Sequence, residues 1–110
     1  MINRSVVIVR PKQSYLDWAD QLDDSDVLPS TDGEHTVYLV PEYDDNVEAM
    51  EILSRIYDTI FEAELEGWHT DESAWPSNRT FAMFREWFIV EFHSVVEDLC
   101  DYEVVDNSAA

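Results

Sequence analysis

The stretch that decides the fold class spans residues 89–97 and has the sequence Ile-Val-Glu-Phe-His-Ser-Val-Val-Glu. As a strand it would alternate, with Val90 and Phe92 on one face and Glu91 and His93 on the other. As a helix it would extend the apolar stripe of the residues before it. We expect a strand, because β-branched residues crowd the stretch and a third strand completes a stable small sheet.

Two earlier stretches supply the other strands. Residues 5–9 are Ser-Val-Val-Ile-Val and residues 36–40 are Thr-Val-Tyr-Leu-Val, both rich in the side chains that favour strands. Each is followed closely by a proline, Pro11 or Pro41, which lacks the N–H that a strand ladder uses. We therefore expect two buried strands that end near these prolines.

Three segments have the apolar period of helices. The first covers residues 15–22, where apolar side chains recur at steps of three and four. The longest, of about six turns, follows the capping residues 44–46, and Gly67 is placed to end it. The third follows a cap expected at Ser77 or Asn78.

The expected order is therefore strand, helix, strand, helix, helix, strand (β-α-β-α-α-β). This order predicts an α+β, two-layer domain in which helices pack on one face of a small three-stranded mixed sheet. We expect one domain over residues 1–105. Residues 106–110 are small or polar, and we expect them to fray as a C-terminal tail.

The net charge restricts the partners of the chain. Its 110 residues include 6 Lys and Arg against 25 Asp and Glu, a formal charge of −19 with neutral histidines. Such a field repels nucleic-acid phosphates and anionic membranes and attracts basic protein faces. The hydrophobic share of 45% and aromatic share of 13% argue against a disordered acidic chain. We expect an ordered domain that binds neither nucleic acid nor membranes.

Cysteine use and hydropathy indicate the compartment. Cys100 is the one cysteine of the sequence, so no disulfide can form within the chain. No stretch approaches the roughly 20 apolar residues of a membrane helix, and the apolar run of residues 6–9 is too short for a signal peptide. We expect a cytoplasmic protein.

Five polar residues are candidates for a site. Glu91 and His93 would share one face of the last strand, where they could act as an acid and base couple or as two ligands of a metal ion. Arg10, Lys12 and Glu42 follow the ends of the first two strands, where open sheets often bind ligands. The alternative is that these residues only form a polar surface, with the cations offsetting nearby carboxylates.

Two tryptophans are candidates for an interface. Trp75 lies in the turn of residues 73–76, and Trp68 lies just before it. Aromatic side chains in such positions anchor either the core or a partner, and Trp75 is the better interface candidate because no helix period explains it.

No metal and no cofactor is expected. The acidic stretch of residues 24–29 lacks the third ligand and the glycine that a calcium-binding loop needs. The histidines His35, His69 and His93 are too scattered for a local zinc motif, and Cys100 has no cation near it in sequence to activate it.

Residues 9–13 (Val-Arg-Pro-Lys-Gln), 75–80 (Trp-Pro-Ser-Asn-Arg-Thr) and 91–94 (Glu-Phe-His-Ser) together carry a family resemblance. With these segments the chain resembles a family of small acidic bacterial proteins over most of its length. The resemblance implies a bacterial cytosolic origin, and it implies no activity or ligand.

Three functions remain open at this point. The favoured one is a protein-interaction module whose acidic surface engages a basic partner, in the way that a mimic of nucleic-acid charge would. An enzyme or ligand binder with Glu42, Glu91, His93, Arg10 and Lys12 around one pocket is less favoured. The third is a homodimer that covers an exposed sheet edge or tryptophan face.

Overall fold

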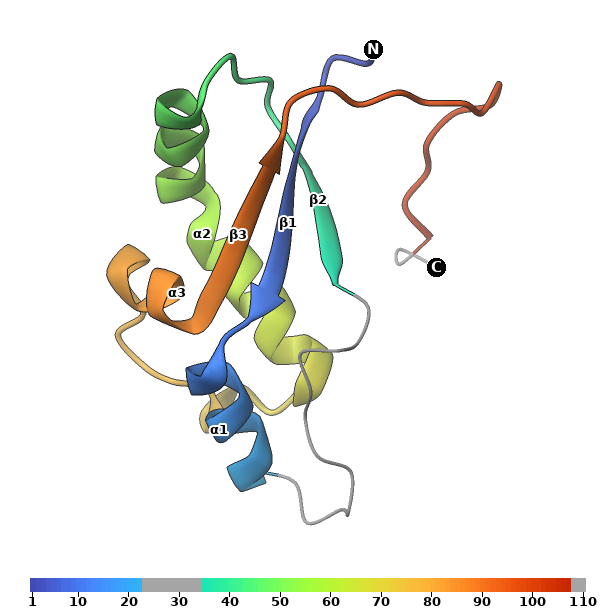
Figure 1. Ribbon diagram of the computed structural model, residues 1–110. Helices are drawn as coiled ribbons and strands as arrows, with labels where there is room; N and C mark the ends of the chain where they lie inside the picture. The colour runs from blue at the N-terminus through green and yellow to red at the C-terminus, as the bar shows by residue number, and fades with distance from the viewer. Residues whose placement is uncertain (23–34, 108–110) are drawn as a thin grey trace.

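The computed structural model describes residues 1–22 and 35–107. Its elements follow the predicted order (Figure 1), which confirms the α+β class. They are β1 (Ser5–Pro11), α1 (Gln13–Leu22), β2 (Thr36–Val40), α2 (Asn46–Trp68), the 3-10 turn η1 (Glu72–Ala74), α3 (Phe81–Trp87) and β3 (Phe88–His93). None of the helices in the described part of the chain is long and apolar enough to cross a membrane.

The sheet has the order β2-β1-β3, and β1 is antiparallel to both neighbours. Val7 of β1 lies opposite Tyr38 on one side and Phe92 on the other. The sheet is three-stranded as predicted, but it is not mixed in its pairings. The reason is that α1 lies beyond the end of β1 instead of running back along the sheet, so β2 begins where β1 stops (Figure 1).

One face of the sheet is covered by helices, as predicted. Val7 and Val9 of β1 are almost fully buried, and α2 presents Leu53, Phe61 and Leu65 to the same core. The other face, which we call the open face, carries the alternate residues of each strand. These are Val6, Ile8, Arg10, Val37, Leu39, Ile89, Glu91 and His93, together with His35 directly before β2.

Phe61 lies at the centre of an aromatic cluster that joins α2, α3 and β3. Its ring centroid is 5.9 Å from that of Phe84, 5.5 Å from that of Trp87 and 5.3 Å from that of Phe88. Since Phe61 and Phe84 are fully buried, the cluster fixes α3 and the start of β3 against α2.

Two predicted helix boundaries were wrong. α2 begins at the expected cap, where Asp45 accepts a hydrogen bond from the N–H of Glu48, but it continues past Gly67 to Trp68. No glycine of the described chain has a positive φ, so Gly67 does not end the helix in the left-handed conformation. α3 is capped by Thr80, not by Ser77 or Asn78, because the Thr80 hydroxyl accepts from the N–H of Met83.

The third strand is shorter than predicted. A strand over residues 89–97 was expected, whereas β3 runs from Phe88 to His93. His93 pairs with Val6, and β1 itself begins at Ser5, so the chain beyond His93 has almost no strand to pair with. One backbone bond, from the N–H of Ile2 to the carbonyl of Val96 at 2.8 Å, continues the contact.

Replacing Phe61 by alanine tests the role of the aromatic cluster. Phe61→Ala leaves a cavity among three rings, and we expect a loss of about 3–5 kcal/mol in the free energy of unfolding. Val47→Ala is the control, because Val47 lies on the same helix with 74% of its surface exposed, and we expect a change within about 0.5 kcal/mol. Urea unfolding measures both. Equal losses would contradict this account of the core.

Candidate functional site

Glu91 and His93 lie together on the open face, as alternate residues of β3. The Nε2 atom of His93 is 2.9 Å from Oε2 of Glu91, and both side chains are about half exposed, at 52% and 48%. This hydrogen bond holds the pKa of the Glu91 carboxyl below its ordinary value, and the charge of Arg10 on the same face acts in the same direction. The pair is an ionised carboxylate beside an imidazole, exposed to water.

Arg10, Lys12 and Glu42 do not form one pocket. Arg10 is on the open face near the end of β1, and Lys12 follows it, donating from Nζ to the carbonyl of Arg85 at 2.7 Å. Glu42 follows the end of β2, which lies at the opposite end of the sheet because β1 and β2 are antiparallel. The predicted convergence of these strand ends would have required parallel strands.

The two tryptophans proposed for an interface form hydrogen bonds within the fold. The indole N–H of Trp68 donates to the carbonyl of Ala19 at 3.0 Å, and that of Trp75 donates to the carbonyl of His69 at 2.8 Å. Trp18 completes the set by donating to the carbonyl of Ala74 at 3.0 Å. All three are half-buried, so these indoles connect α1, the end of α2 and η1.

Trp68→Phe tests whether this residue stabilises the fold. The change removes the bond to Ala19 and part of the packing, and we expect a loss of about 1–3 kcal/mol in the free energy of unfolding. Tyr102→Phe is the control, because Tyr102 is 73% exposed and we expect a change within about 0.5 kcal/mol. Thermal unfolding monitored by circular dichroism compares the two. A Trp68 variant as stable as the wild type would leave an interface role as the better explanation.

Sequence reasoning missed a polar cluster around Glu64 of α2. Oε2 of Glu64 accepts hydrogen bonds from Thr36 and Tyr38, each at 3.0 Å, and the backbone carbonyl of Glu64 accepts from Tyr15 at 2.7 Å. Glu64 also lines a cavity of about 250 Å³ between α2, the end of β1 and the start of β2. The sequence contains one indication of this cluster, because Glu64 lies four residues after Ile60 and therefore on the buried side of the helix.

Burial changes the pKa values of the titratable groups in this cluster. It raises the pKa of the Glu64 carboxyl, although the hydroxyls of Thr36 and Tyr38 act against that rise. Burial and then the Glu64 charge raise the pKa of Tyr15 to about 12, and the same two causes raise the pKa of Tyr38. The cluster therefore favours neutral phenols and disfavours the ionised carboxylate.

Glu64→Gln tests this conclusion through the pH dependence of stability. Because the pKa of Glu64 is higher in the folded state than in the unfolded state, its contribution to stability falls as pH rises through the folded pKa. Compared with wild type, Glu64→Gln should gain stability between pH 4 and pH 7 in urea unfolding. Glu66→Gln, an exposed position on the same helix, is the control and should show a smaller difference. A Glu64→Gln profile parallel to that of wild type would contradict the prediction.

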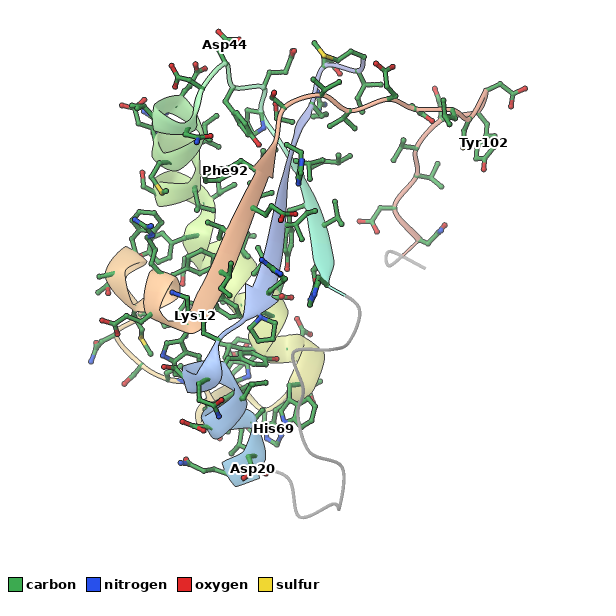
Figure 2. The ribbon with its side chains drawn as sticks, in the orientation of Figure 1. Lys12, Asp20, Asp44, His69, Phe92 and Tyr102 are labelled. Carbon is green, nitrogen blue, oxygen red and sulfur yellow. The ribbon has the colours of Figure 1, made fainter. Side chains whose placement is uncertain are left out.

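Carboxylates gather at the end of the sheet where β2 and β3 stop. We call Glu42, Asp44, Asp45 and Glu48 the acidic end. Asp44 lies there, far from Lys12 and Asp20 (Figure 2). A small hollow of about 130 Å³ opens beside it, lined by Met1, Ser5, Glu42, Tyr43, Asp44, Ser94 and Val95.

Few cations neutralise the carboxylates of the described chain. Arg79 pairs with Asp58 at 3.1 Å and with Glu62 at 2.7 Å, and the amino group of Met1 pairs with Glu97 at 2.8 Å. Within residues 1–22 and 35–107, the four carboxylates of the acidic end form no ion pair. Glu42, Asp44 and Asp45 are exposed and Glu48 is half-buried, so the charge of the first three faces solvent.

No metal-binding cluster is formed by the residues that the structure describes: no three His, Cys, Asp or Glu side chains come together there. The stretch of residues 24–29 considered for calcium lies outside the described residues.

Comparison of the chain with models of known protein families, with curated proteins and with solved structures found no match. The resemblance to a family of small acidic bacterial proteins stays a prediction. The candidate site therefore depends on the geometry alone.

Proposed function

We propose that this protein is an acidic interaction module that engages a basic protein surface, with the acidic end as its contact. The observation that carries the proposal is the group of four carboxylates at that end, which the fold leaves without ion pairs. The single cysteine, Cys100, supports a reducing, cytoplasmic setting for this function.

The physical basis is long-range attraction. Each exposed carboxylate acts over the Debye length, which is about 8 Å at physiological ionic strength, and a net charge of −19 adds to the attraction. Complementary charge speeds the encounter with a basic face and suppresses acidic partners. Nucleic-acid phosphates attract the same basic faces, so a protein of this kind competes with nucleic acid for them.

Neutralising the acidic end tests the proposal. The variant Glu42→Gln/Asp44→Asn/Asp45→Asn removes three negative charges, and asparagine still caps α2 at position 45. The probe is a fluorescein-labelled peptide of twelve lysine and arginine residues, measured by fluorescence anisotropy. We expect affinity to fall about tenfold, since each exposed ion pair contributes up to about 1 kcal/mol.

The matched control is Asp20→Asn/Glu72→Gln/Glu86→Gln. It removes the same charge from exposed positions on α1, η1 and α3, and we expect less than about a twofold loss of affinity. Raising the salt concentration should weaken wild-type binding steeply. Equal losses in the two variants, or binding that salt does not change, would show that the acidic end is not a specific contact.

A further inference from the structure

Two apolar surfaces of the described chain are exposed to water. The first is the open face, where Val37 is 57% exposed, Leu39 50% and Ile89 41%. The second is the C-terminal arm, residues 95–105, which is irregular and acidic. Its exposed large side chains are Val95 at 69%, Leu99 at 96%, Tyr102 at 73%, Val104 at 74% and Val105 at 67%. Exposed apolar surface on this scale is typical of an interface.

We propose that a second copy of this chain covers both surfaces, in a symmetric dimer in which the arm of each copy lies across the open face of the other. The arm leaves the domain beside the sheet and does not rest on it (Figure 1), and Tyr102 lies far from Phe92 and the rest of β3 (Figure 2). The proposal is independent of the basic partner proposed above.

The length of the arm fits the open face. Val96 and Glu97 are held at the N-terminus by the bond from Ile2 and by the ion pair with Met1, so the free part begins at Asp98. From Asp98 to Val105 an extended chain spans about 26 Å. The strands of the sheet have five to seven residues, or about 17–23 Å, so an arm can cross the whole face.

Arg10 is the cation that the open face offers to an acidic arm. Its charge also acts on Glu91 of the same face, but its Nε atom is buried without a hydrogen-bond partner among the described residues. Asp101 and Glu103 of the arm are exposed carboxylates that form no ion pair within the described chain. An arm lying across the open face brings such carboxylates to Arg10 and to the adjacent His35.

A second copy of the chain can cover the open face because it carries the same arm. Both halves of the contact, arm and face, belong to one sequence, and a twofold axis completes the contact twice. Two copies that each carry a net charge of −19 repel each other, whereas the same net charge attracts a basic partner. Added salt should therefore strengthen the dimer and weaken basic-peptide binding, so that failure of one proposal is distinguishable from failure of the other.

The mass in solution tests the dimer, measured by sedimentation in reducing buffer at about 0.5 M salt, where charge repulsion is screened. Wild type should have twice the monomer mass. The variants Val37→Ser/Leu39→Ser and Leu99→Ser/Val104→Ser should each weaken the dimer at least about tenfold, because burial of apolar surface drives it. Val47→Ser, which changes an exposed apolar side chain on α2, should not. A monomeric wild type overturns the proposal.

Cys100 lies in the arm and is free and exposed, so it can carry a photo-cross-linker. Wild type labelled there with benzophenone maleimide is mixed as ¹⁵N and ¹⁴N chains and irradiated. The expected cross-linked products join the arm of a chain labelled with one isotope to β1 or β2 of a chain labelled with the other. Cross-links confined to single chains would show an arm that folds onto its own sheet, and cross-links away from the open face would show another contact. Either result overturns the proposal.

Discussion

The packing of α2 against one face of the sheet is the contact on which the rest of the structure depends. β1 is the middle strand, and its residues Val7 and Val9 are buried against the apolar side of α2. Phe61 extends this contact to α3 and β3 through three rings. Without α2 the sheet would lose the longest helix of its second layer, and two-layer folds are stabilised by burial between the layers.

Because helices cover only one face of the sheet, the open face and the acidic end carry polar side chains and exposed apolar side chains. The open face holds the Glu91 and His93 pair on β3 and the apolar side chains of Val37 and Leu39 on β2, with β1 between them. No element of the described chain covers Leu39, which is half exposed. The carboxylates of the acidic end form no ion pairs within the described chain. The two proposed contacts, a basic partner at the acidic end and a second copy on the open face, use different surfaces and respond to salt in opposite directions.

The antiparallel topology explains why the predicted pocket does not exist. Arg10 lies near the end of β1 and Glu42 follows β2, so an antiparallel pairing separates them by the length of the sheet. The same topology brings Thr36 and Tyr38 beside Glu64, and it creates a half-buried carboxylate that no motif identified. The position of Glu64 in the helix period indicates that it lies on the buried side of α2. Its hydroxyl partners lie on β2, far away along the chain, and no local sequence pattern indicates them.

The sequence by itself determined the order of the elements, their approximate bounds, a helix cap within residues 44–46 and the net charge. These follow from local periodicity and composition, which act within a few residues. Only the tertiary structure decided the strand directions, the end of β3 at His93 and the use of the Trp68 and Trp75 indoles within the fold. Each of these depends on contacts between segments that are distant along the chain or held in place by tertiary packing, and hydrophobic periodicity does not encode such contacts.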